Sequence, residues 1–203
     1  MRIGVVTGSS RPGRRGDQVA RWVLEQAREH VRDTRPAEFV AVDVADLGLP
    51  MLDEPAPAAI GDYRNPHTRR WAGIVASLDG FVVVTPEYNH SMPAVLKNAV
   101  DYLFAEWNDK AAGFVGYGLN GGTRAVEHLR GTLAEVKIAC VRTQVALSLF
   151  TDFEIADMTE PGTFTPAAHH ADLVGRLVDE VLDWAGALRG LRDRVAEPAA
   201  AGR

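Results

Sequence analysis

Short apolar runs alternate along the chain with stretches in which apolar residues recur at helical spacing. The apolar runs predict five buried strands, at residues 3–7, 39–44, 81–85, 111–116 and 138–147. The helical spacing predicts helices at about 18–31, from 66, over 93–104, from 123, and at 165–188. Alternating strands and helices form a parallel sheet with helices on both faces, so the pattern predicts a doubly wound α/β fold.

The pattern continues without an internal repeat or a shift in composition, which predicts a single domain over residues 1–190. Residues 191–203 are expected to form a flexible C-terminal tail. The proline-rich segment 46–66 is too long for a plain connection, so we expect a lid, a subunit contact or disorder there. Near the start of the last helix, His169 and His170 are expected on the surface.

Composition and charge narrow the classes of function. The 203 residues carry a net charge of −5 and no basic stripe, so nucleic acid is not an expected partner. No apolar run reaches the ~20 residues of a membrane span, and the chain enters its first strand without a signal peptide. We therefore expect a cytoplasmic protein with no membrane partner. The single cysteine, Cys140, has no disulfide partner and is interpreted as a core thiol.

A loop of small and polar residues follows the first strand and leads into a helix, an arrangement that binds phosphate. The hydroxyl of Ser9 and the guanidinium of Arg11 can donate charge-assisted hydrogen bonds to the anion. The backbone N–H groups at the helix start point at the same anion, and they are expected from Gly16, Asp17, Gln18 and Val19.

The same loop matches the P-loop of nucleotide triphosphatases only in part. Gly8 and Gly13 have the P-loop separation, but an arginine pair stands where Lys and Ser or Thr are required. Without that hydroxyl there is no magnesium ligand, so nucleotide triphosphate hydrolysis is disfavoured. The pair, Arg14 and Arg15, has two open interpretations: a solvated basic pair, or part of a site for the 2′-phosphate of NADPH.

Two further polar loops follow the third and fourth predicted strands. The segment 86–91 reads Pro-Glu-Tyr-Asn-His-Ser and is dense in hydrogen-bonding groups. The later loop places Gly116, Gly118 and Gly121 in the G-x-G-x-x-G spacing, which is a weak dinucleotide signal this far along the chain. Because all three loops leave one edge of the sheet, where open α/β sheets bind ligands, a single ligand can contact all of them.

These motifs resemble those of the NADPH-dependent FMN reductase family. The segment 86–103, PEYNHSMPAVLKNAVDYL, is similar to the family's flavin-ring loop and the helix after it, and Gly-Ser-x-Arg at 8–11 is similar to its phosphate loop. The Ser and Asn that many members carry in the phosphate loop fall on Arg14 and Gly16 here. The resemblance implies a flavodoxin-like fold, with five parallel strands in the order 2-1-3-4-5, that holds FMN.

The resemblance also implies where FMN contacts the chain. The phosphate is expected at Ser9, Arg11 and the backbone of residues 16–19. The isoalloxazine ring is expected against Pro86, Glu87, Tyr88, Asn89 and Ser91, with Tyr117, Gly118, Gly121 and Gly122 along its edge.

The implied activity is oxidation of NADPH or NADH by bound FMN, followed by ping-pong electron transfer to a quinone, azo compound, metal oxyanion or free flavin. No catalytic side chain and no metal are expected, because the cofactor carries the redox chemistry. A homodimer or homotetramer is implied as well. Two alternatives stay open: a flavodoxin-like electron carrier without direct NADPH oxidation, and a non-flavin nucleotide-binding regulator supported only by the glycine spacing.

Overall fold

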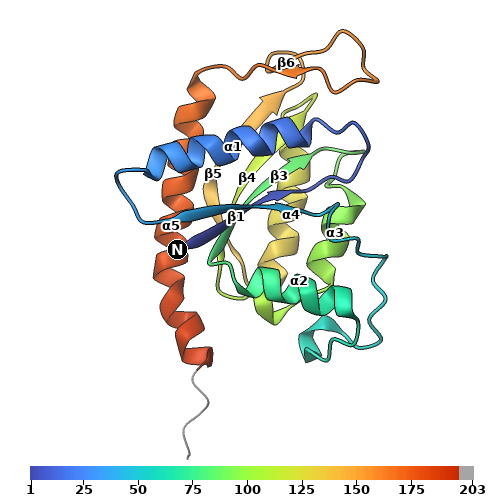
Figure 1. Cartoon of the computed structure of the whole chain (residues 1–203), viewed down its shortest axis with the longest axis vertical. Coiled ribbons are helices and arrows are strands. Elements are labelled where there is room, and N and C mark those ends of the chain that lie inside the picture. Colours follow the sequence, from blue (N-terminus) through green and yellow to red (C-terminus); the bar gives the residue numbers. More distant parts are fainter. Residues whose placement is uncertain (197–203) are drawn as a thin grey trace, which may run out of the picture.

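A parallel sheet of five strands forms the centre of the computed structural model, which describes residues 1–196 (Figure 1). The strands are β1 (Arg2–Thr7), β2 (Glu38–Asp43), β3 (Gly80–Pro86), β4 (Ala111–Gly118) and β5 (Ala139–Ser148). They lie in the order β2-β1-β3-β4-β5, and every neighbouring pair is parallel. The flavodoxin-like order expected from the sequence is confirmed.

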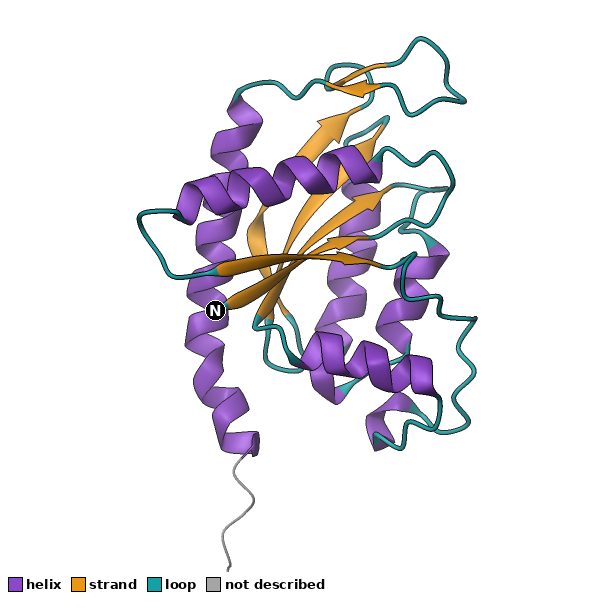
Figure 2. Cartoon of the chain, viewed as in Figure 1, coloured by secondary structure: helices purple, strands orange, loops and turns teal. Residues whose placement is uncertain are grey.

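Helices cover both faces of this sheet because alternate strand residues point to opposite sides and both sets are apolar. In β3, Val82 lies in the core formed with α1 and α5, and Phe81 lies in the core formed with the other three long helices. Figure 2 shows the sheet between these two helical layers. The helices are α1 (Gly16–Val31), α2 (Pro66–Ala76), α3 (Ala94–Asp101), α4 (Thr123–Glu135) and α5 (His169–Ala196), with short 3-10 turns η1 (Ala58–Ile60) and η2 (Ala105–Trp107).

The last helix differs from its predicted bounds at both ends. It begins at His169 instead of 165, and it continues through 191–196, which were expected to belong to a flexible tail. Arg192 explains the extension, because its guanidinium donates to Asp109 O at 2.8 Å and to Asp79 Oδ1 at 2.9 Å. The rest of the predicted tail, 197–203, lies outside the described residues. No helix in the described range is long and apolar enough to cross a membrane.

A small hairpin, which the sequence pattern did not predict, connects β5 to α5. Its strands β6 (Phe153–Glu154) and β7 (Thr163–Phe164) pair antiparallel. Asp152 anchors both ends of this segment, because its carboxylate accepts hydrogen bonds from Ser148 N at 2.8 Å and Ala167 N at 3.2 Å.

The expected surface position of the two histidines is wrong for His170. Its side chain is 8% exposed, and its Nε2 lies 3.0 Å from Asp152 Oδ1. Burial lowers the pKa of His170 although the neighbouring carboxylate acts in the opposite direction. His169 is exposed as predicted.

The proline-rich segment 46–66 is held against α3 by hydrogen bonds, so it is not disordered. Asn98 accepts the Leu52 N–H at 2.9 Å and donates to Pro50 O at 2.7 Å. Tyr102 Oη donates to Asp53 Oδ1 at 2.9 Å. Whether this segment is a lid or a subunit contact stays a prediction.

The cysteine lies where a core thiol was expected. Cys140 is partly buried and packs against the core on the α4 face of the sheet. Burial raises the pKa of its thiol to about 11, which makes it a poor nucleophile.

Candidate functional site

The three polar loops meet at the carboxyl edge of the sheet, because they follow the adjacent strands β1, β3 and β4 (Figure 2). Backbone hydrogen bonds join them there. Gly8 N donates to Val84 O at 2.8 Å, and Glu87 N donates to Tyr117 O at 3.2 Å. A ligand at this edge can therefore contact all three loops, as expected for an open α/β sheet.

A hydroxyl pair connects the first loop to the second. Ser9 is fully buried, and its Oγ lies 2.9 Å from Tyr88 Oη. The same Ser9 Oγ accepts the Arg11 N–H at 3.4 Å. The exposed Arg11 guanidinium lies over the Tyr88 ring, 6.0 Å from its centroid. The structure thus brings Ser9, Arg11 and Tyr88 together. The sequence assigned the first two to the phosphate end of the site and Tyr88 to its ring end.

The start of α1 offers two free backbone donors. Among the described residues, the N–H groups of Gly16 and Asp17 have no hydrogen-bond partner, whereas those of Gln18 and Val19 both donate to Arg15 O, at 3.2 and 3.4 Å. Unpaired amides at a helix N-terminus, reinforced by the helix dipole, favour an anion. An added Cβ on Gly16 would lie 2.8 Å from Tyr117 Oη, so a larger residue here would have to displace the end of the Tyr117 side chain.

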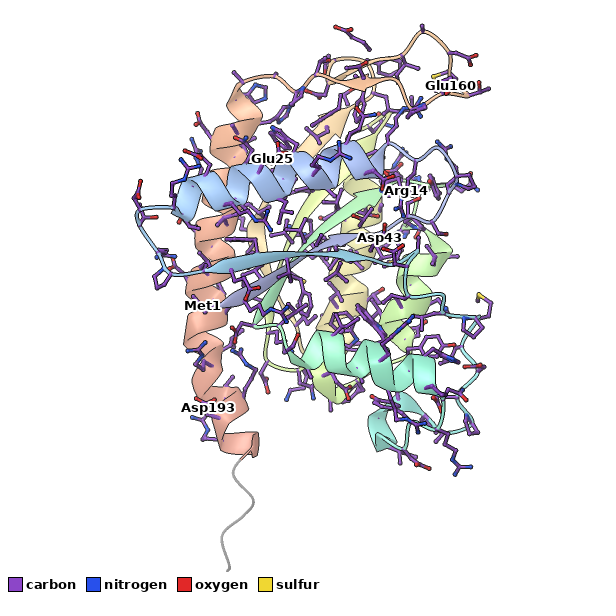
Figure 3. The ribbon with its side chains drawn as sticks, in the orientation of Figure 1. Met1, Arg14, Glu25, Asp43, Glu160 and Asp193 are labelled. Carbon is purple, nitrogen blue, oxygen red and sulfur yellow. The ribbon has the colours of Figure 1, made fainter. Side chains whose placement is uncertain are left out.

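Arg14 and Arg15 are not a solvated pair, so that interpretation is wrong. Arg14 pairs with Asp43 at the end of β2, with Nη1 to Oδ1 at 2.8 Å, and it also bonds Asp17 and Ser9 O. Figure 3 shows Arg14 and Asp43 side by side at the edge of the sheet. Arg14 therefore stabilises the conformation of the loop by joining it to the end of β2.

Arg15 turns to the other side of the loop and is only 5% exposed. Its Nη2 donates to Glu160 O at 2.7 Å, in the hairpin loop at the top of Figure 3. Its Nε is buried and has no hydrogen-bond partner among residues 1–196. An enclosed side chain of this kind does not fit the second open interpretation either, in which the pair contacts the 2′-phosphate of NADPH.

The second loop forms a tight turn at Asn89 and His90. Tyr88 and Ser91 exchange backbone hydrogen bonds at 2.9 and 3.0 Å, and the two residues between them have φ angles of 47° and 72°. Positive φ at both central positions is the requirement of a type I′ turn. The turn leaves Asn89 and His90 exposed at the open end of the site.

Glu87 joins the second loop to the third. Its side chain is 7% exposed, accepts the Arg124 N–H at 3.1 Å and pairs with the Arg124 guanidinium. Because the N-cap residue of α4, Gly122, has no side chain to cap the helix, Glu87 provides the cap from a neighbouring loop. Burial acts to raise the pKa of Glu87, but hydrogen bonds and charge from Arg124 hold it below the ordinary value.

The glycines of the third loop are required by the loop's own backbone. An added Cβ on Gly116 would lie 2.6 Å from Gly121 O, and one on Gly122 would lie 2.6 Å from Tyr117 N. Gly121 and Gly122 both have a φ of +66°. Their spacing therefore follows from internal packing, and Gly118, whose nearest contact would be 3.5 Å away, is the least restricted of the set.

Tyr117 points away from the third loop and into the core on the α1 face, where it is 5% exposed. Its hydroxyl lies beneath Gly16, at the start of α1. Burial raises the pKa of Tyr117 above that of an ordinary tyrosine. Tyr117 was expected along the ring edge together with Gly118, Gly121 and Gly122. Of these four residues, it lies nearest to the free amides at the start of α1.

Sequence reasoning missed His128 on α4. Its Nδ1 lies 2.9 Å from Ser91 Oγ, and its ring centroid is 6.2 Å from that of His90. Helical spacing places His128 on α4, but only the packing of α4 beside the second loop brings it to Ser91. No cluster of three or more His, Cys, Asp or Glu side chains suited to a metal occurs in the described part of the chain.

The geometry suits an elongated ligand with an anionic group and a flat ring. The free amides of Gly16 and Asp17 at the start of α1 fit the anion. The turn at 88–91 offers polar side chains, and the glycine loop lets a flat ring approach its backbone closely.

Comparison with known proteins gives consistent matches. Residues 1–152 match the family model described as NADPH-dependent FMN reductase. An NAD(P)H-dependent FMN reductase of Schizosaccharomyces pombe is 37% identical over 162 residues, which cover 79% of each chain. A quinone reductase of Pseudomonas putida is 30% identical over 174 residues, which cover 78% of this chain and 87% of that one.

A solved structure agrees on the fold. It is the flavoenzyme FerB, an NAD(P)H:(acceptor) oxidoreductase from Paracoccus denitrificans. It superposes with a TM-score of 0.66 over 92% of this chain and 97% of its own, at 21% identity. At this level of identity the likeness supports the architecture alone.

Proposed function

The chain belongs to the NADPH-dependent FMN reductase family, and from this premise we propose that it oxidises NAD(P)H and passes two electrons through FMN to a small-molecule acceptor. The family consists of oxidoreductases, which favours an enzyme over a nucleotide-binding regulator. The observation that carries the proposal is the meeting of the three loops at one edge of the sheet, with an anion site at one end and the turn at 88–91 at the other.

At the anion end, we assign the FMN phosphate to Ser9, Arg11 and the free amides of Gly16 and Asp17. Gln18 and Val19 belong to the same helical turn, but their amides already bond Arg15 O, so they contribute through the shape of the turn.

At the ring end, we assign the isoalloxazine to the backbone and side chains of the second loop, with the third loop along its edge. Glu87 acts here by fixing the two loops to each other. The proposed ring contacts are Pro86, Tyr88, Asn89, Ser91, Gly118, Gly121 and Gly122, whereas the Tyr117 side chain lies beneath Gly16 at the anion end.

Bound FMN supplies hydride acceptance from the nicotinamide and two-electron transfer to the second substrate. The protein contributes placement: the Ser9–Tyr88 hydrogen bond and the capped start of α4 hold both ends of the site rigid. We assign no side chain to acid or base catalysis. Donor and acceptor would occupy the same open end of the site in turn, so we propose a ping-pong sequence.

Among acceptors, quinones are our first candidate because the Pseudomonas putida relative, a quinone reductase, aligns with most of this chain. Azo compounds, metal oxyanions and free flavin are further candidates. We also propose a homodimer or homotetramer.

Steady-state NADPH oxidation with menadione tests the proposal. Turnover that depends on added FMN supports a reductase. Retention of FMN without turnover, with either NADPH or NADH, would favour the electron carrier instead.

A further inference from the structure

A groove of about 640 Å³ lies between α3 and α4, which pack on the same face of the sheet (Figure 1). Its size is within the range of small-molecule sites, about 300–1,000 Å³. Ser91, the last residue of the turn at 88–91, also lines this groove. The groove therefore continues directly from the open end of the proposed site, and a molecule held at the turn can extend into it.

His128 forms part of the α4 wall of the groove, next to the turn. Its Nδ1 lies 2.9 Å from Ser91 Oγ, and the exposed His90 ring is 6.2 Å away between centroids. Among residues 1–196, the other ring nitrogen, Nε2, has no hydrogen-bond partner. When Ser91 Oγ donates to Nδ1, the Nε2–H is left free to donate to a ligand.

Lys97 stands on the α3 wall of the same groove and supplies a positive charge. Its Nζ donates to both carboxylate oxygens of Asp101 at 2.7 Å, and the two side chains are 46% and 39% exposed. An exposed ion pair of this kind contributes little stability, so Lys97 can exchange the carboxylate for the phosphate of a ligand at small cost. The two walls thus offer a cation and an N–H donor to one anion.

Gly131 keeps the groove open on the α4 side. It lies in the interior of the helix, and an added Cβ there would meet nothing within 4 Å. Glycine in a helix interior is less stable than alanine, and no neighbouring atom requires it at this position. The missing side chain leaves room for a ligand beside Lys97 and His128.

We propose that this groove binds the diphosphate of the nicotinamide donor, with Lys97 and His128 on its two walls, while the nicotinamide lies at the turn at 88–91. The inference rests on the proposed function, because it requires a dinucleotide as donor. NAD(P)H is an elongated molecule in which one ribose separates the nicotinamide from the diphosphate, so it can reach from the turn into the adjoining groove. Since NADPH and NADH share the diphosphate, the groove serves both.

Steady-state kinetics of Lys97→Met test the proposal. We expect the KM for NADPH and the KM for NADH to rise alike, by roughly tenfold, as for loss of a charged hydrogen bond. The KM for menadione and the Kd for FMN should stay constant, and Lys97→Arg should recover most of the donor affinity. The matched control is Lys137→Met, because Lys137 is an exposed lysine that also pairs with a carboxylate, that of Asp109, and it should change neither KM.

A second variant blocks the groove without removing a charge. Gly131→Leu should raise the KM for both donors several-fold, while the thermal midpoint stays constant or rises, because leucine favours a helix over glycine. Gly73→Leu in α2 is its control, since an added Cβ there also meets nothing within 4 Å, and it should leave the KM values unchanged. Gly131→Leu keeps the proposal testable if Lys97→Met does not fold.

A readout without turnover uses ADP-ribose, which carries the diphosphate but no nicotinamide. Calorimetry on the purified protein should show binding to the wild type and to Gly73→Leu. The Kd should be at least several-fold higher in Lys97→Met and in Gly131→Leu.

A higher KM for menadione with unchanged KM values for both donors would overturn the proposal, because the groove would then serve the acceptor. A change in oligomeric state in Gly131→Leu, measured by size-exclusion chromatography, with unchanged donor binding would overturn it in favour of a subunit contact. A protein that neither binds FMN nor oxidises NAD(P)H would contradict the proposed function. ADP-ribose binding that depends on Lys97 would still support the groove in that case, and its absence would overturn both.

Discussion

The hydroxyl of Ser9 lies 2.9 Å from the hydroxyl of Tyr88, although 79 positions separate the two residues in the chain. Ser9 is fully buried at the end of β1, and Tyr88 begins the turn after β3. This hydrogen bond fixes the phosphate loop relative to the ring loop. Because hydride transfer depends on placement within fractions of an ångström, a rigid connection between the two ends of the cofactor site has functional value.

Replacing Tyr88 by Phe should therefore weaken FMN binding. Loss of one hydrogen bond is expected to lower the free energy of unfolding by about 0.5–1.5 kcal/mol. The matched control is Tyr63→Phe, which removes a hydroxyl bonded to Glu106 Oε2 at 2.8 Å, away from the three loops. Chemical denaturation and FMN titration of both variants check the prediction. It would fail if Tyr63→Phe weakened FMN binding as much as Tyr88→Phe.

Arg11→Ala should weaken FMN binding by about 1.5–3 kcal/mol, the value of a hydrogen bond to a charged group. The guanidinium is exposed and stacked over Tyr88, so its removal should change the stability of the fold little. Equilibrium titration with FMN, compared with Arg21→Ala on the outer surface of α1, measures the effect. Unchanged FMN affinity in Arg11→Ala would refute the assigned phosphate position.

Glu87→Gln should lower the free energy of unfolding at pH 7 by about 1–3 kcal/mol, because it removes the charged partner of Arg124 and weakens the cap of α4. The pKa of Glu87 is held below its ordinary value of 4.5, so its stabilising effect is complete above that pH. It is lost as the pH falls through the folded-state pKa. The difference between wild type and variant should therefore narrow in acid.

Denaturation curves from pH 7 down to pH 3 measure this difference. The control is Glu127→Gln, also on α4, whose carboxylate is 71% exposed and lies 3.6 Å from Arg130. A gap between wild type and Glu87→Gln that stayed constant below pH 4.5 would contradict the account.

Because Lys110 is buried, the free energy of unfolding should rise as the pH is raised and this lysine loses its proton. Burial, with a further contribution from Arg192, lowers the pKa of Lys110 to about 8 from an ordinary value of 10.5. Between those values the folded state releases a proton that the unfolded state keeps, so the free energy of unfolding rises with pH, by on the order of 3 kcal/mol. Denaturation at pH 7.5, 9 and 10 should show the rise.

The rise should be absent in Lys110→Met and present in Lys137→Met, whose native side chain is 54% exposed. Subtracting the variant curves from the wild-type curve removes the contributions of tyrosines that titrate in the same range. A wild type and a Lys110→Met variant with parallel pH curves would show that the lysine stays charged in the fold.

The positions of the strands and the meeting of the three loops were predictable from local patterns, and the strand order was predictable from the family resemblance. Apolar runs marked the strands, and the motif at 86–103 fixed the topology through its family resemblance. The role of Glu87 as a cap for α4 was not predictable, since it joins residues 37 positions apart through a backbone N–H. The same holds for His128, which reaches Ser91 only when α4 packs beside the turn.

The hairpin after β5 escaped prediction for a different reason. Its strands contain two residues each, too few to show a period of two along the sequence. The buried position of His170 depends on Asp152, which the hairpin segment brings to it. Arg15 likewise reads as a surface residue in the sequence, and only the hairpin that covers it shows otherwise.

The central claim is that the protein holds FMN and reduces it with NAD(P)H. The most direct test is the visible absorption spectrum of the purified protein after addition of FMN and desalting, recorded again after anaerobic addition of NADPH. The account predicts flavin bands that survive desalting and bleach with NADPH. Bands that survive but bleach with neither NADPH nor NADH, or a protein that retains no flavin and reduces none supplied in solution, would contradict it.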